Sequence, residues 1–176
     1  AGFTHWAKLN NLKQAAKTMN FLTEHGISNY GELESKLTAL SARRDTAHAE
    51  IKRIESRSAE LTLVMKHAGT YRQLKPLYDR YRKSNDKEKF LRGHESEIIL
   101  FEAAARELKR LGAVPLPTTE SMKTELANLN AEKERLLAEY KAARTEAQEY
   151  DTVKQNVDAL LTVPKEQVQK QVNELE

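Results

Sequence analysis

The sequence lacks cysteine altogether and is poor in the residues that make turns or cross membranes. Without thiols the chain forms neither a disulfide framework nor a thiolate metal site. Glycine and proline number only six and four among 176 residues. No apolar run approaches the roughly 18 residues that a membrane-spanning helix needs. The opening AGFTHWAKL also lacks the basic-then-apolar order of a signal peptide. We therefore expect no membrane insertion.

Motifs for catalysis or for metal and cofactor binding are missing as well. The histidines show no HxH or HExxH spacing, and they are His5, His25, His48, His67 and His94. The glycines are isolated, and no phosphate-binding loop ending in GK[ST] occurs. Acidic residues are abundant, but on solvated helices they mostly form ion pairs with bases three or four positions away. We therefore predict no catalytic residue, no metal and no cofactor.

The residues that are present are typical of long helices. Charged residues make up 31% of the chain against 39% hydrophobic, which is too polar for a thick globular core. The opening AG suggests a processed or engineered start, so we expect a segment of a larger protein. A first helix is predicted over residues 4–25 and stops at Gly26. Its apolar stripe comprises Trp6, Leu9, Leu12, Ala16, Met19 and Leu22.

Two longer stripes follow a heptad rhythm, with apolar residues alternately three and four apart. The first begins after a cap at Ser28 or Asn29 and comprises Tyr30, Leu33, Leu37, Leu40, Ala47, Ile51, Ile54, Leu61, Met65 and Ala68, with Arg44 and Ser58 in its gaps. The second begins at Thr118 or Thr119 and comprises Met122, Leu126, Leu129, Leu136, Tyr140, Ala143, Ala147, Tyr150, Val157 and Leu161, with Lys133 and Lys154 in its gaps. The polar residues either select one register or mark places where the seam meets solvent. In the simplest antiparallel register Arg44 lies near Ala143 and Ala147.

Shorter helices are expected between these arms. Gly69 breaks the first rhythm, and a shifted stripe of Tyr71, Leu74, Tyr78 and Tyr81 runs to Ser84. A further helix over residues 95–111, stopped by Gly112, places Ile98, Phe101, Ala105 and Leu108 on one face. The prediction is an all-α fold: a long antiparallel coiled-coil hairpin with shorter helices packed between its arms. Its divisions are an N-terminal helix (1–27), a first arm (28–68), a connecting region (69–117), a second arm (118–162) and a C-terminal tail (163–176).

Basic charge concentrates in residues 70–94, the basic region. Its net charge of +5 exceeds the +3 of the whole chain. Such a region suits contacts with nucleic-acid phosphates, although a solvated charged face explains it about equally well. The candidate contacts are Arg72, Lys75, Arg80, Arg82, Lys83, Lys87, Lys89 and Arg92. Interleaved aromatic residues are candidates for base stacking, although their seam spacing favours packing, and they are Tyr71, Tyr78, Tyr81 and Phe90.

Three segments resemble the region that follows the nuclease domain in relaxases, the mobilisation nucleases of conjugative elements from Gram-positive bacteria. They read WAKLNNLKQAAKTMNFLTEHGI, YRQLKPLYDRYRKSNDKEKFLRGHESEIILFEAAARELKRLG and EYDTVKQNVDALL. Relaxases nick DNA with a tyrosine assisted by a metal on a histidine cluster. No histidine cluster is present here, so no tyrosine of this chain is matched to that nucleophile.

The resemblance implies an accessory, non-catalytic segment of a bacterial cytoplasmic protein that acts in plasmid or transposon mobilisation. Its partners would be DNA, other conjugative-transfer proteins or the coupling ATPase. The alternative is a coiled-coil interaction or dimerisation domain without nucleic-acid affinity. Apolar residues beyond the heptad stripes would then contact a partner helix or a second copy of the chain in a homodimer. These residues are Ile99, Leu100, Val153 and Leu160.

Overall fold

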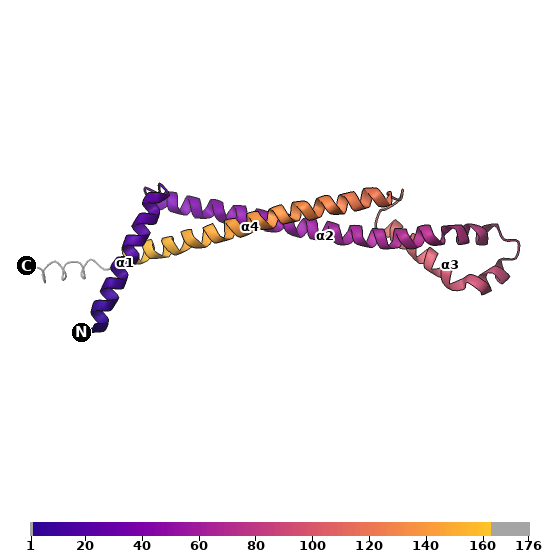
Figure 1. The fold of residues 1–176 in the computed structure, drawn as a ribbon, viewed down its shortest axis with the longest axis horizontal. Helices are drawn as coiled ribbons and strands as arrows, with labels where there is room; N and C mark the ends of the chain where they lie inside the picture. The colour runs from indigo at the N-terminus through magenta and orange to yellow at the C-terminus, as the bar shows by residue number, and fades with distance from the viewer. Residues whose placement is uncertain (1, 163–176) are drawn as a thin grey trace, which may run out of the picture. The chain divides into compact units, whose positions relative to one another are not determined.

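The computed structural model describes residues 2–162, with side chains from residue 10 onward, and the predicted tail at 163–176 lies outside them. The described residues form four helices and no strand, which confirms the all-α prediction. These helices are α1 (Gly2–Glu24), α2 (Tyr30–Lys83), α3 (Lys87–Arg110) and α4 (Thr119–Leu161), labelled in Figure 1. No helix in this part of the chain combines the length and apolar character needed to cross a membrane.

Polar side chains cap the helices at the predicted places. Asn29 Oδ1 accepts a hydrogen bond from the Glu32 amide at 3.0 Å, and the Ser28 amide donates to Glu32 Oε2 at 2.7 Å. Thr118 Oγ1 likewise accepts from the Ser121 amide at 3.1 Å, so Asn29 and Thr118 satisfy the free N–H groups that begin α2 and α4. The predicted stops are also confirmed, because Gly26 and Gly112 adopt φ angles of 65° and 69°, which side chains disfavour.

The predicted helix break at Gly69 is wrong, because α2 runs through it for 54 residues and contains Pro76 as well. A glycine inside a helix costs only about 1 kcal/mol relative to alanine. Burial of Ala68 and packing of Tyr71 on either side of Gly69 offset that cost. The shorter helix expected over residues 71–83 is therefore the C-terminal part of α2. The next helix, α3, begins at Lys87, earlier than expected.

The chain divides into two compact units, which are described separately. Unit 1 comprises Ala1–His48 and Leu137–Glu176, and unit 2 comprises Ala49–Leu136. In unit 1, Lys36 pairs with Glu146 and Arg43 with Glu139, so residue numbers fall along α4 as they rise along α2. The two helices therefore run in opposite directions within this unit. Its buried core comprises Leu33, Leu40, Ala147, Tyr150 and Val153, so Val153 is not a surplus surface residue.

The face that α1 turns toward the core of unit 1 differs in part from the predicted stripe, of which Leu22 does pack against that core. Leu12 and Met19 are 68% and 59% exposed, whereas Thr18 is only 2% exposed. Asn156 of α4 explains the difference, because its Nδ2 donates to Thr18 Oγ1 at 3.2 Å and its Oδ1 accepts from Gln14 Nε2 at 2.8 Å. These hydrogen bonds satisfy polar groups that burial would otherwise penalise. Trp6 and Leu9 of the stripe lie outside the described side chains.

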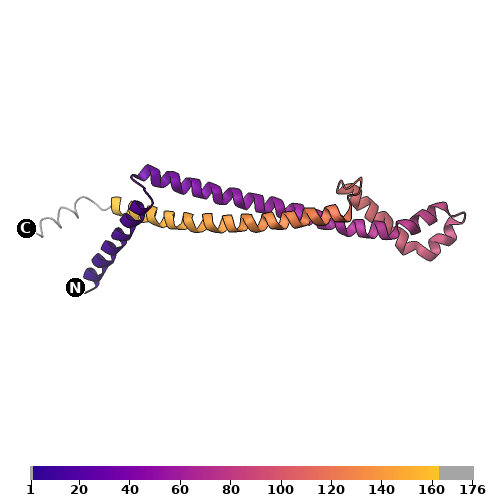
Figure 2. The same ribbon diagram turned by 45° about the horizontal axis from the view of Figure 1, so that its top comes forward.

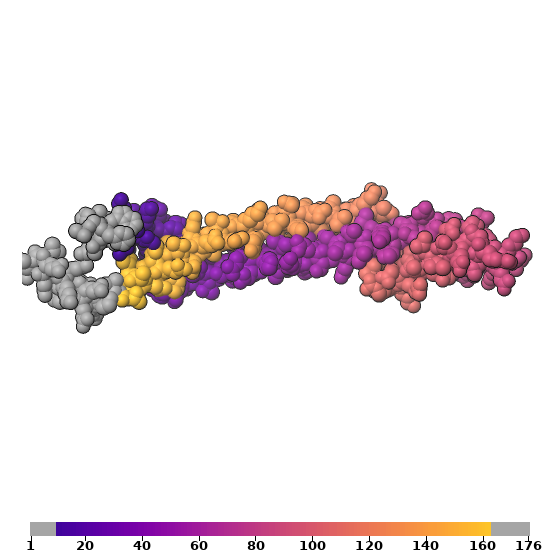
Figure 3. Space-filling view, turned by 90° about the horizontal axis from the view of Figure 1, so that it is seen from below, coloured from indigo at the N-terminus to yellow at the C-terminus, as the bar shows by residue number. Residues whose placement is uncertain are grey.

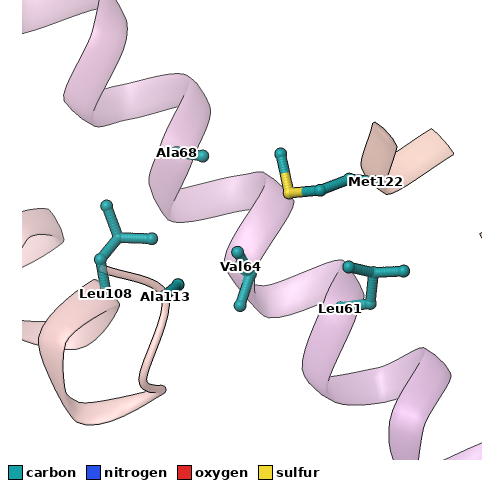
Figure 4. Packing of buried hydrophobic residues seen from close by; sticks show 6 residues of the cluster. All are labelled: Leu61, Val64, Ala68, Leu108, Ala113 and Met122. Carbon is teal, nitrogen blue, oxygen red and sulfur yellow. The ribbon is translucent and has the colours of Figure 1, made fainter. Parts of the chain in front are cut away.

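Unit 2 has its own core, formed where α2 meets α3 and the start of α4. Figure 4 shows its members, and they are Leu61, Val64, Ala68, Leu108, Ala113 and Met122. Val64, which lies outside the heptad stripe, is buried because α2 packs against more than one neighbour here. On α3 the buried residues are Ile98, Phe101, Ala104 and Leu108. Ala104 thus takes the place predicted for Ala105.

Two of the polar seam residues form ion pairs between α2 and α4. Lys133 Nζ lies 2.9 Å from Glu55 Oε1 in unit 2. Hydrogen bonds from Lys133, and then from Lys52, hold the pKa of the Glu55 carboxyl below its ordinary value. In unit 1, Lys154 Nζ lies 3.0 Å from Asp158 Oδ2 and 3.8 Å from Glu34 Oε1. Both lysines reach partly exposed carboxylates, so the seam meets solvent at these places and also carries charge pairs specific to one register.

Candidate nucleic-acid interface

The predicted basic region lies wholly in unit 2. It comprises the last turns of α2, the link at residues 84–86 and the first turns of α3, which double back beside the end of α2 (Figure 2). Asp86 caps α3 by accepting a hydrogen bond from the Lys89 amide at 3.0 Å. Bases that are spread over 21 positions of sequence are therefore gathered on two adjoining helix ends.

Three of the eight candidate bases are held by contacts within the chain. Arg72 donates from Nη1 to Thr119 Oγ1 at 2.7 Å and from Nη2 to the Pro117 carbonyl, which ties α2 to the segment before α4. Lys75 Nζ pairs with Asp79 at 3.0 Å. The guanidinium of Arg80 lies 5.8 Å from the ring centroid of Phe90, a cation–π distance.

The other five bases are exposed and make no side-chain hydrogen bond or ion pair with any described residue. They are Arg82, Lys83, Lys87, Lys89 and Arg92. Acidic groups offset them only in part, because Asp79 is paired with Lys75, Asp86 caps α3, and Glu88 is the one further acidic residue of the basic region. The helix ends therefore present concentrated positive charge to solvent, which is the electrostatic requirement for holding a phosphate backbone.

The four aromatic candidates contact other rings of the same unit. Tyr71 and Tyr78 both stack on Phe101, with ring centroids 4.8 and 4.2 Å apart. Tyr81 lies 5.9 Å from Tyr78 and 6.1 Å from Phe90. These contacts attach α2 to α3 and favour packing as the role of the rings. Base stacking stays a prediction for them.

His94 shapes this region and was not predicted from the sequence. It adopts non-helical angles inside α3, with φ −142° and ψ 25°, and so bends the helix. Its ring lies 4.8 Å from that of Phe90, and its Nδ1 lies 3.6 Å from Glu97 Oε1. The bend sets the direction of the first turns of α3, which carry Lys87, Lys89 and Arg92. The preceding Gly93 is the sequence signal that could have indicated it.

The arrangement offers charge and hydrogen-bond donors. Among the described side chains, which begin at residue 10, no three histidine, cysteine or acidic residues lie close enough together to hold a metal ion. No family model, curated protein or solved structure matches this sequence.

Proposed function

We propose that this chain is a non-catalytic accessory domain of a mobilisation relaxase and holds DNA during conjugative transfer in the bacterial cytoplasm. The observation that carries the proposal is the set of five exposed bases at the adjoining ends of α2 and α3 whose side chains pair with no described residue. The resemblance of three sequence segments to relaxases supplies the context. Docking of other transfer proteins or of the coupling ATPase would be a further part of the same task.

The contacts within unit 2 favour phosphates over bases as the part of DNA that is bound. Arginine and lysine contact phosphates without reading sequence, whereas base stacking requires free aromatic faces. Tyr71, Tyr78 and Phe101 form one stack, so those faces are largely occupied. We therefore expect affinity for both single- and double-stranded DNA, with a strong dependence on salt.

We also propose that the heptad stripes of α2 and α4 pair as the arms of an antiparallel coiled-coil hairpin. Ion pairs between the two helices within each unit support this pairing, as between Arg43 and Glu139 in unit 1 and between Arg57 and Glu125 in unit 2. The hairpin would act as a scaffold that presents the basic helix ends away from its core.

The test is fluorescence-anisotropy binding of labelled single- and double-stranded oligonucleotides across a salt series. The variant changes Arg82, Lys83, Lys87 and Lys89 to Gln. Each phosphate contact contributes about 0.9 to the slope of log affinity against log salt for duplex DNA and about 0.7 for single strands. Loss of four contacts should therefore flatten the slope by about 3.6 and about 2.8, respectively.

A matched control removes the same charge from other exposed positions of unit 2. It changes Lys66, Arg106, Lys109 and Lys123 to Gln, since none of these side chains has an ion-pair partner among the described residues. The control should keep most of the salt slope. Equal losses in both variants would mean that net charge alone drives binding. Absence of binding by the unmodified chain at low salt would refute the DNA-holding role.

A coiled-coil interaction or dimerisation domain is the second candidate function. Exposed apolar residues favour it, since Ile99 and Leu100 of α3 are each 54% exposed and Leu160 of α4 is 48% exposed. Large exposed apolar side chains are typical of surfaces that a partner covers. Light scattering discriminates the two candidates, because a stable oligomer without DNA affinity would favour this second function.

A further inference from the structure

A groove in unit 1 gathers two arginines from different helices. It has a volume of about 600 Å³ and is lined by residues of α2 and α4 that include Arg44, Arg144, Ser41, Tyr140 and Leu37. The same stretches of α2 and α4, purple and light orange, border a hollow in Figure 3. The groove exists because Arg44 occupies a seam position where a buried apolar side chain would otherwise fill the space. Ala147, which also lines it, is too small to fill that space.

Neither of the two arginines has an acidic residue three or four positions away on its own helix. Those positions hold Leu40, Ser41, Ala47 and His48 around Arg44, and Tyr140, Lys141, Ala147 and Gln148 around Arg144. Elsewhere on α2 such acids neutralise bases, as in the pairs Arg53–Glu50 and Lys52–Glu55. Arg144 therefore has no acidic partner of this kind, and among the described residues Arg44 pairs only with the adjacent Asp45.

The existing contacts of the groove leave donors free. Arg144 makes no hydrogen bond or ion pair with the described residues. Arg44 uses Nε and Nη2 on the carboxylate of Asp45, at 2.8 Å each, and Asp45 is itself 67% exposed. Asp151, the one acidic residue that lines the groove, accepts a hydrogen bond from Gln155 at 2.8 Å. The lining thus carries more positive than negative charge, together with the hydroxyls of Ser41 and Tyr140.

We infer that this groove is a phosphate-binding site. Guanidinium groups bind phosphate through paired, charge-assisted hydrogen bonds. Two guanidinium groups that line one groove can therefore bind the same phosphate group. The volume lies in the range of small-ligand sites, and Leu37 and Ala147 give it an apolar surface. A nucleotide or a backbone phosphate of a nucleic acid would present the same group. The site lies in unit 1 and does not rest on the DNA role proposed for unit 2.

The test follows the arginine Nε–H signals of the full chain by NMR during titration with three probes: inorganic phosphate, adenosine monophosphate and an oligothymidylate. The signals of Arg44 and Arg144 are expected to shift on addition of ligand. Arg144→Gln should weaken binding about tenfold or more, because the variant loses a charge-assisted hydrogen bond to the phosphate. Arg144 is exposed, so the variant should fold normally.

Lys141→Gln provides the matched control. Lys141 lies on the same helix, three residues from Arg144, and does not line the groove. It should bind the probes with nearly unchanged affinity. Shifts with inorganic phosphate and the nucleotide would identify a free phosphorylated ligand, and shifts with the oligonucleotide alone would identify a nucleic-acid backbone. No shift with any probe, or equal weakening by both variants, would overturn the inference.

Discussion

Replacement of Tyr150 by alanine should destabilise unit 1 more than a comparable change at its surface. The Tyr150 side chain is 2% exposed and packs with Leu33, Leu40 and Val153. Its ring meets the edge of Phe21, with centroids 5.0 Å apart at 79°. Burial raises the pKa of its hydroxyl above the ordinary value, because the charged form would lose its hydration.

The expected loss follows from the size of the buried side chain. Replacing a buried aromatic residue by alanine costs about 3–5 kcal/mol, through lost burial and the cavity left behind. About 1.4 kcal/mol corresponds to a factor of ten in an equilibrium constant, so opening of unit 1 should become roughly 140- to 3,700-fold more frequent. Hydrogen exchange measured by mass spectrometry should show this acceleration in residues 30–48 and 137–161, with a smaller effect in α3.

Tyr140→Ala is the matched control, because Tyr140 is ten residues away on the same helix but only partly buried, beside His48. It should accelerate exchange by much less. If Tyr150→Ala changed exchange by less than about tenfold, or no more than Tyr140→Ala, the packing described for unit 1 would be wrong.

Three further predictions concern two glycine positions and pH. Gly69→Ala should raise the free energy of unfolding by about 0.5–1 kcal/mol, because alanine favours the helix. The added Cβ also meets no atom within 4 Å. Gly26→Ala should lower the free energy of unfolding by about 1–2 kcal/mol, because φ at Gly26 is +65°, an angle that a side chain disfavours. Urea denaturation measures both changes, and equal changes in the two variants would contradict both glycine predictions. A hydrogen bond from Tyr30, and then one from Lys154, lowers the pKa of Asp158, so the folded state favours the carboxylate. The resulting stability is present above the unfolded pKa of about 3.9 and is lost as pH falls through the lower folded pKa. Tyr30→Phe should therefore reduce the thermal midpoint at neutral pH and show a shrinking difference from the unmodified chain in acid, whereas a constant difference would refute the linkage.

Helix ends and helix type were predictable because local signals determine them. Asn29, Thr118, Gly26 and Gly112 act through their own side chains or backbone angles, so their roles are confirmed. The continuity of α2 through Gly69 was not predictable, because packing against other segments offset a local helix-breaking signal. The basic region was found from composition, but its division into held and free bases was not. That division depends on contacts such as Arg72 with Pro117 and Thr119, which lie 45 or more residues away.

The sequence by itself determined that this protein is helical, where its helices are capped and where its positive charge concentrates, since each of these depends on residues close together along the chain. Only the tertiary structure decided which face of α1 is buried, because Asn156 satisfies Thr18 and Gln14 while Leu12 and Met19 stay exposed. It also brought Arg44 and Arg144 to one groove, 100 residues apart in sequence. Hydrogen bonding and packing between distant segments outweigh a helix's own apolar pattern in deciding which face of the helix is buried. The reason is that buried polar groups need hydrogen-bond partners, and distant segments supply them.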